Sequence, residues 1–98
     1  TGGGIKDNIS RIIPKGKCAN INLDKIKTKK IFTWLKNNKI SDSEMLKTFN
    51  CGVGFVVIIN NKNNKIIKKF FSKKYSPYVI GKIIKGNNKV LLNGKINW

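Results

Sequence analysis

The glycines at the start of the chain are the residues with the clearest chemical use. Gly2, Gly3 and Gly4 follow Thr1 without interruption. Glycine readily adopts positive φ and lets another group approach the main chain closely. Apolar residues follow at helical spacing, so this turn leads into a helix N-terminus. The free N–H groups and the positive dipole end there suit a phosphate. A tight turn without a ligand fits this short pattern equally well.

A second glycine-containing stretch, residues 50–54, leads directly into the most apolar run of the chain, residues 55–59. A continuous apolar run predicts a central strand or one covered on both faces. Glycines where such a strand begins indicate close approach by a neighbour or a ligand. We expect Cys51 in this stretch to pack in the interior, because the chain has no His that could activate it as a nucleophile.

Acid–base and metal chemistry have few candidate residues. The chain has no His and only four carboxylates, and its two cysteines, Cys18 and Cys51, form no C-x-x-C pair. No zinc site can be assembled from such a set. We therefore expect no metal site and no catalytic residue on this segment, and two free thiols in a reducing cytoplasm.

The net charge of +17 would ordinarily indicate a nucleic-acid partner. The basic residues are nearly all lysines, however, and Arg11 is the single arginine. Arginine is the better reader of base edges and phosphates because of its planar geometry. Lys, Asn and Ile are abundant here and share A/T-rich codons, so compositional drift explains the charge. We expect a solvated basic surface and no specific nucleic-acid binding.

Four stretches carry the apolar spacing or the capping residues of helices. They are residues 5–13, ended by Pro14; residues 29–38, capped by Thr28 and expected to form a core helix; a helix after the capping box of Ser41 and Glu44; and residues 66–73, coated with lysines. Strands are predicted on both sides of the last helix. We therefore favour its packing on a sheet over its lying on a membrane surface.

Strands are predicted at residues 17–23, 55–59, 78–84 and 89–92, the last two joined by a hairpin at Gly86-Asn87-Asn88. The tail, residues 93–98, is mostly polar and is expected to be loose. The elements predict one α+β unit, an α/β sandwich with helices packed on a mixed sheet of three to four strands. No apolar run approaches the ~20 residues of a membrane-spanning helix.

Six segments share the order and spacing of one enzyme family: Thr1-Gly2-Gly3-Gly4; Asn8-Ile9 with Arg11 and Pro14; Ile31-Phe32-Thr33-Trp34-Leu35; Glu44-Met45-Leu46; Thr48-Phe49-Asn50-Cys51-Gly52-Val53-Gly54; and Tyr78-Val79-Ile80-Gly81. Together they resemble the end of the C-terminal domain of phosphoribosylformylglycinamidine cyclo-ligase, also called aminoimidazole ribonucleotide synthetase. The string from Thr48 to Gly54 is the most specific of the six.

The resemblance implies an ATP-dependent ligase of de novo purine biosynthesis, a cytoplasmic homodimer that converts formylglycinamidine ribonucleotide to aminoimidazole ribonucleotide. It implies that residues 1–98 are the latter part of the C-terminal domain. The N-terminal ATP-binding half, which would be the partner of this segment, and the first part of its own domain would lie outside it. ATP and Mg²⁺ would serve the parent enzyme through ligands elsewhere, so we expect the 98 residues alone to be catalytically silent.

The resemblance also assigns a substrate- and phosphate-binding wall. It comprises Thr1, Gly2, Gly3, Gly4, Asn8, Arg11, Asn50, Gly52 and Gly54. We expect its two glycine stretches to lie side by side, because both open onto one end of the sheet. Arg11 could contact a phosphate or brace the turn. Ser10 stands where the family usually has Pro, which should loosen the first turn slightly.

Two other classes of function stay open. One is a related ATP-binding enzyme of the same architecture: selenophosphate synthetase, thiamine-monophosphate kinase or formylglycinamidine ribonucleotide synthetase. The string from Thr48 to Gly54 argues against these. The other is a non-enzymatic basic nucleic-acid-binding module, whose affinity for duplex DNA would depend steeply on salt.

Overall fold

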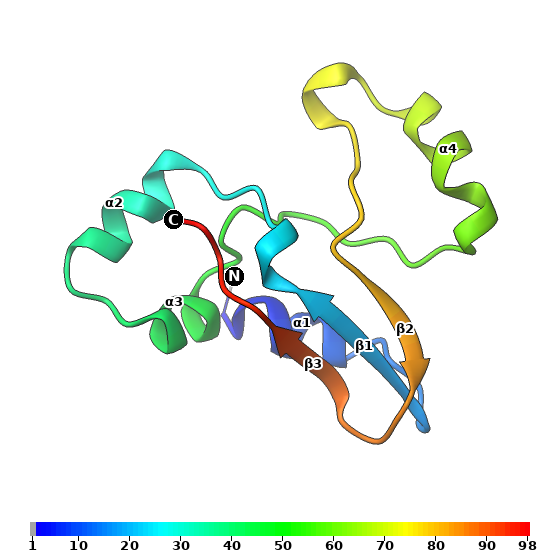
Figure 1. Ribbon diagram of the computed structural model, residues 1–98, viewed down its shortest axis with the longest axis horizontal. Coiled ribbons are helices and arrows are strands. Elements are labelled where there is room, and N and C mark those ends of the chain that lie inside the picture. Colours follow the sequence, from blue (N-terminus) through cyan, green and yellow to red (C-terminus); the bar gives the residue numbers. More distant parts are fainter. Residues whose placement is uncertain (1) are drawn as a thin grey trace.

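The computed structural model describes residues 2–98 and shows helices on a three-stranded mixed sheet (Figure 1). The α+β class predicted from the sequence is therefore confirmed. The longer elements are α1 (Gly4–Ser10), β1 (Lys17–Asn22), α2 (Lys30–Asn37), α3 (Asp42–Thr48), α4 (Asn64–Ile67), β2 (Gly81–Lys85) and β3 (Lys89–Asn93). Single 3-10 turns lie at η1 (Leu23–Lys25), η2 (Asn61–Asn63), η3 (Lys68–Phe70) and η4 (Lys73–Tyr75).

The sheet has the order β2-β1-β3, so the first strand of the chain lies in its centre. β1 pairs antiparallel with β2 and parallel with β3. The predicted hairpin between β2 and β3 is therefore wrong. The connection at residues 86–88 crosses the beginning of β1, where the Gly86 N–H donates to the Gly16 carbonyl over 3.2 Å. Both outer strands thereby reach the apolar central strand instead of each other.

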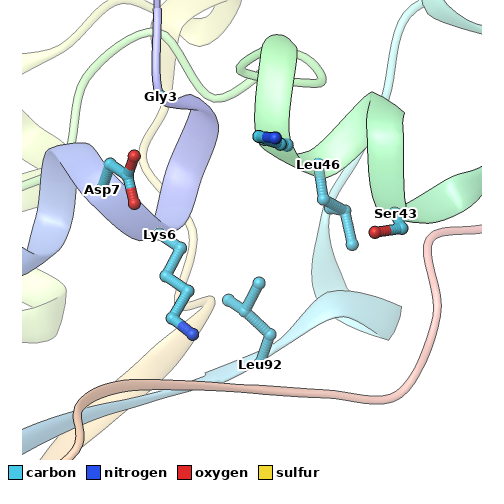
Figure 2. A pocket seen from close by; sticks show the side chains of 7 residues that line it. Gly3, Lys6, Asp7, Ser43, Leu46 and Leu92 are labelled. Atoms are coloured by element: carbon cyan, nitrogen blue, oxygen red, sulfur yellow. The ribbon is translucent and has the colours of Figure 1, made fainter.

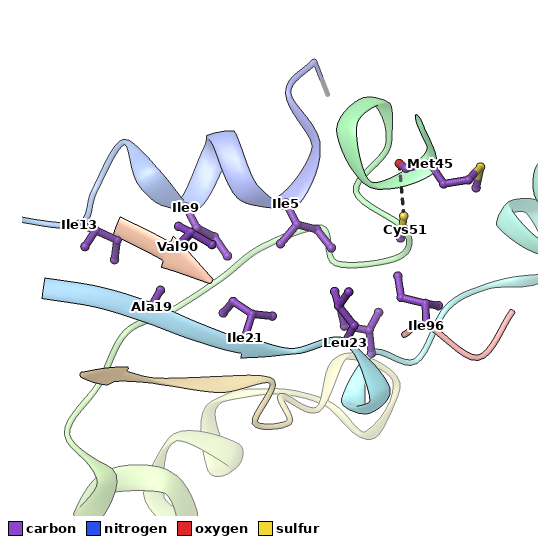
Figure 3. Close-up of a cluster of buried hydrophobic side chains, with 11 residues drawn as sticks. Ile5, Ile9, Ile13, Ala19, Ile21, Leu23, Met45, Cys51, Val90 and Ile96 are labelled. Carbon is purple, nitrogen blue, oxygen red and sulfur yellow. Dashed lines mark hydrogen bonds between the residues drawn. The ribbon is translucent and has the colours of Figure 1, made fainter. Parts of the chain in front are cut away.

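The core lies between α1 and one face of the sheet. Figure 3 shows Ile5 and Ile9 directed from α1 toward Ala19 and Ile21 of β1, with Val90 of β3 beside them. All five are buried because the strand alternates and the helix repeats its apolar residues at i and i+4. α1 and β1 thus supply most of the packing between the helices and the sheet that the α+β prediction required.

α1 ends at Ser10, one turn earlier than the predicted end near Ile13. Pro14 disfavours the helical conformation for the residue before it, so the last turn cannot be completed. The Ser10 hydroxyl donates to the Asp7 carbonyl over 2.8 Å, which satisfies one group of the last turn. Ile12 is consequently 59% exposed, while Ile13 still reaches the core.

α3 begins as its sequence predicted. The Ser41 hydroxyl is the N-cap and accepts a hydrogen bond from the Glu44 N–H at 3.2 Å. The second half of the capping box does not form, because the Glu44 carboxylate accepts from the Thr48 hydroxyl at 2.8 Å. Met45 points from this helix into the core and is fully buried.

α2 is a peripheral helix, so its prediction as a core helix is wrong. None of its residues is buried, and Trp34 is 62% exposed. Phe32 and Leu35 alone pack against the core, and the ring of Phe32 lies 6.2 Å from that of Phe49. Lys29, not Thr28, is the N-cap, and the buried Thr28 hydroxyl has no hydrogen-bond partner in residues 2–98.

Residues 55–59 form no strand, which contradicts the predicted central strand. Both sides of β1 are already occupied by β2 and β3, and this segment pairs with neither outer edge. The predicted helix at residues 66–73 is also wrong in part: it consists of α4 followed by η3. Figure 1 shows α4 well away from the sheet, and Phe70 of η3 is 80% exposed. This segment therefore does not pack on the sheet as predicted.

Two other boundaries differ from the prediction. β2 begins at Gly81 rather than Tyr78, although the Ile80 carbonyl extends the pairing by accepting from the Asn22 N–H at 2.8 Å. The tail is anchored rather than loose. Ile96 is buried, and the Trp98 indole donates to the Asp42 carboxylate over 3.1 Å.

Candidate functional site

Tight packing accounts for the glycine turn before α1. Gly3 and Gly4 have φ of 89° and 56°, which glycine adopts without a steric penalty. A Cβ on Gly4 would overlap the Leu46 carbonyl oxygen and lie 3.1 Å from the Phe49 oxygen. A Cβ on Gly3 would lie 2.8 Å from Cβ of Asp7. The turn is therefore where α1 begins against the end of α3, whether or not a ligand binds there.

Asn8 braces this turn. Its amide nitrogen donates to the carbonyls of Gly4 at 2.6 Å and Gly2 at 3.2 Å. The Arg11 guanidinium donates in turn to the Asn8 amide oxygen at 3.3 Å. Arg11 thus contacts the residue that braces the turn, and its contact with a phosphate stays a prediction. Thr1, the other predicted residue of the turn, lies outside the described residues.

The second glycine stretch is a compact loop after α3. The Asn50 side-chain oxygen accepts from the Gly52 N–H at 2.9 Å. Gly52 has φ of 102°, and a Cβ there would lie 3.2 Å from the Lys27 carbonyl oxygen. Gly52 is therefore required by the close approach of the chain before α2. Gly54 is different, because a Cβ there would meet nothing within 4 Å.

Cys51 is a packing residue, as its sequence context predicted. It is fully buried, and its thiol donates toward the Met45 and Phe49 carbonyls, each at 3.6 Å. Burial raises the pKa of this thiol from the ordinary 9.0 to about 11. Cys18 is also free and buried. Because a thiolate is the reactive form, Cys51 is unsuited to nucleophilic chemistry at neutral pH.

The two glycine stretches meet at one hollow, which we call the apolar hollow. It has a volume of about 210 Å³. Of the predicted site residues, Gly4, Asn8, Asn50 and Gly54 line it, whereas Gly2, Gly3, Arg11 and Gly52 do not. The rest of its wall is apolar and was not predicted: Ile5, Ile9, Ile12, Val53, Phe55 and Val56. The one sequence signal for this apolar wall was the helical spacing of Ile5, Ile9 and Ile12, which we interpreted only as the apolar face of a helix.

A second hollow, of about 230 Å³, opens between α1, α3 and β3, and we call it the lysine hollow (Figure 2). It is lined by Gly3, Lys6, Asp7, Ser43, Leu46, Lys47 and Leu92. Its two lysines provide positive charge beside the glycine turn. Of the predicted site residues, Gly3 alone lines this hollow; its other walls come from separate segments of the chain and carried no motif.

The described chain offers nothing that would hold a metal ion. Among residues 2–98, no three His, Cys, Asp or Glu side chains come together. Mg²⁺ prefers carboxylate oxygens in octahedral geometry, so these residues do not fit that ion. Within the same residues, no helix is long and apolar enough to cross a membrane.

Comparison with known proteins extends the resemblance seen in the sequence. Residues 1–92 match the family described as AIR synthase related protein, C-terminal domain. The chain is also similar to the trifunctional purine biosynthetic protein adenosine-3 of Chironomus tentans, with 42% identity over 86 residues. That alignment covers 86% of this chain but 6% of the relative, so the chain spans a small part of the relative's length. Because the family match covers nearly the whole chain, this protein belongs to the family of AIR synthase related C-terminal domains.

Proposed function

We propose that this chain is part of an aminoimidazole ribonucleotide synthetase. In this role it forms the latter part of the C-terminal domain and contributes a glycine-rich wall to a substrate- and phosphate-binding cleft. The observation that carries the proposal is the apolar hollow, where Gly4 and Asn8 meet Asn50 and Gly54. The relative's name, which refers to purine biosynthesis, supports the same reaction sequence. The parent enzyme would be a cytoplasmic homodimer that uses ATP and Mg²⁺.

The chemistry of this wall is binding and orientation. The main chain at Gly54 is open to an incoming group because no atom occupies the space that a side chain would fill. Asn50 keeps its amide nitrogen as a donor, since its oxygen is bonded to the Gly52 N–H. In the lysine hollow, Lys6 and Lys47 outnumber the one carboxylate, Asp7, and so leave a net positive charge for a phosphate. None of these groups is a general base, so the reacting atoms require residues from elsewhere in the enzyme.

A hybrid enzyme tests the proposal. Residues 1–92 of this chain would replace the matched segment of the Chironomus relative, and ATP-dependent formation of aminoimidazole ribonucleotide would be measured. Gly54→Leu places an apolar side chain at a wall of the apolar hollow, at a position where a Cβ would meet nothing within 4 Å. We expect it to raise KM for the ribonucleotide about ten-fold or more, the loss of ~1.4 kcal/mol of binding. Ser72→Leu, at an exposed position outside both hollows, is the matched control. Equal KM and kcat for the two variants would refute the role of the hollow.

The isolated chain should show no turnover, because its described residues include neither a metal-binding cluster nor a general base in the apolar hollow. Incubation with ATP, Mg²⁺ and formylglycinamidine ribonucleotide, followed by detection of the aminoimidazole product, checks this expectation. Product formed by the 98 residues alone would place a catalytic group on this segment. It would overturn the proposal that this segment binds substrate while the catalytic groups lie elsewhere in the enzyme.

A further inference from the structure

Residues 54–59 have an unpaired main chain, and all of their apolar side chains except Val56, which packs against the core, are exposed. Phe55 is 86% exposed, and Val57 and Ile58 are each nearly half exposed. Within residues 2–98, no main-chain N–H or C=O group of this segment bonds to another main-chain group. Figure 1 shows the segment as an uncoiled ribbon between α3 and the turns around α4. Such a row of free donors and acceptors on an apolar segment is a template for an added strand.

The sequence of this segment matches its unpaired state. The run from Phe55 to Ile59 is wholly apolar and rich in β-branched residues, which favour the pleated, half-buried surface of a sheet. Its exposure therefore leaves apolar area in water that a partner strand would cover. A polar, glycine-rich linker would gain nothing from such pairing, so the composition indicates a strand that lacks its neighbour.

Charge argues against a second copy of this chain as the neighbour. Each copy has a net charge of +17, and no Asp or Glu occurs after Glu44. Lys62 and Lys65 lie just beyond the unpaired segment, in η2 and α4, so two paired copies would bring two strongly positive surfaces together. A neutral or acidic strand would meet no such repulsion. The longer relative, of which the matched region is 6%, has ample chain to supply one.

We propose that residues 54–59 are a docking strand for a β-strand from the remainder of the longer polypeptide, supplied by the stretch that immediately precedes the matched region. Consecutive elements are usually neighbours in space, which favours the preceding stretch. The partner strand should be apolar in its centre and should carry acidic residues opposite the lysines. This inference rests on the proposed function, because it requires the longer enzyme and because Gly54, Phe55 and Val56 of the segment also line the apolar hollow. Its test reads amide exchange and needs no turnover, so the two proposals can fail separately.

Hydrogen exchange tests the proposal. The preceding stretch of the Chironomus relative would be joined to the complete chain, and exchange of the amides of residues 54–59 would be compared with that in the chain alone. We expect exchange to slow about ten-fold or more in the joined protein. Unchanged exchange would overturn the assignment. A dimer of the chain alone, seen by light scattering and with the same amides protected, would overturn it in favour of a second copy.

Two matched pairs of variants separate strand pairing from non-specific contact. Val57→Pro removes one N–H donor and should abolish the protection, whereas Val57→Thr keeps the donor and should retain it. Phe55→Asp should disrupt docking, whereas Phe70→Asp, at a residue of similar exposure on η3, should not. Equal loss in both members of either pair would refute docking at this strand. Folding of each variant is monitored by exchange at β1, which lies outside the segment.

Discussion

Replacing the glycines before α1 one at a time isolates what the turn contributes to stability. Gly2, Gly3 and Gly4 are neighbours in sequence, yet an added methyl group would meet very different surroundings at each. At Gly2 it would meet nothing within 4 Å, and at Gly3 it would meet the Asp7 side chain. At Gly4 it would meet the main chain of α3. We expect stability to fall in the order Gly2→Ala, Gly3→Ala, Gly4→Ala, with the last by far the most destabilising.

The magnitude for Gly4→Ala has two parts. Alanine at φ of 56° costs about 1 kcal/mol for the left-handed conformation. The new Cβ would also overlap the Leu46 carbonyl group, whose carbon lies at 2.9 Å. α1 can escape only by moving away from α3, which loosens the packing of Ile5 and Met45. Losing much of that burial costs about 2–4 kcal/mol. The total is about 3–5 kcal/mol, a large share of the stability of a small domain.

Urea unfolding followed by far-ultraviolet circular dichroism measures these differences. Gly2→Ala should change the free energy of unfolding by about 0.5 kcal/mol or less. Gly3→Ala should cost about 1–2 kcal/mol, because the φ of 89° is strained for alanine and the first turn of α1 must shift slightly to relieve the contact with Cβ of Asp7, which no side-chain rotation can move. A Gly4→Ala variant within about 1 kcal/mol of the parent would refute the reasoning, since the contact with Leu46 could then not be as close as described.

Three further predictions concern single side chains. The fold raises the pKa of Cys51 to about 11, so the contribution of this thiol to stability is fully present below the unfolded pKa near 9 and is lost as pH rises to 11. The difference in unfolding free energy between the parent and Cys51→Ala should therefore shrink over that range. A constant difference would contradict the shift. Ile96→Ala should cost about 2–4 kcal/mol in urea unfolding because Ile96 is buried. The control Asn97→Ala, beside it, should be near neutral. If the two variants lost the same small amount of stability, the tail would be loose. Asn8→Ala removes the donor to Gly4 and Gly2 and should cost about 1–2 kcal/mol, while Asn87→Ala, at an exposed position, serves as its control.

Local signals predicted the parts of the fold that local physics determines. Ala19 and Ile21, two positions apart, place one face of β1 in the core, although Cys18 on the opposite face is also buried. Ser41 caps α3 through a bond to a residue three positions on. Features that depend on distant neighbours were not predictable in this way. The turn at residues 86–88 has hairpin chemistry but crosses β1, and residues 55–59 have strand composition but no partner in the described chain. An amphipathic pattern likewise could not show that α2 is peripheral.

The candidate site likewise has features that the sequence predicted and features that it did not. Both glycine stretches were recognisable because few other residues tolerate their backbone geometry, and the structure brings Gly4 and Gly54 to one hollow. Their separate roles were not recognisable from the sequence. Gly4 and Gly52 are needed for close packing, while Gly54 leaves the main chain open. The lysine hollow depends on the approach of three distant segments, and Gly3 alone of its wall residues was predicted.

The position of β1 in the centre of the sheet has a consequence for how the chain acquires its structure. β1 lies near the beginning of the sequence, but both of its neighbours, β2 and β3, come from the last fifth. During synthesis the ribosome therefore releases the central strand long before either partner exists. Until then, Ala19 and Ile21 lack both neighbouring strands, and α1 is the helix already made that packs against them in the core. Folding should be limited by this long-range closure, and early release of the chain before β3 would expose an apolar strand to aggregation.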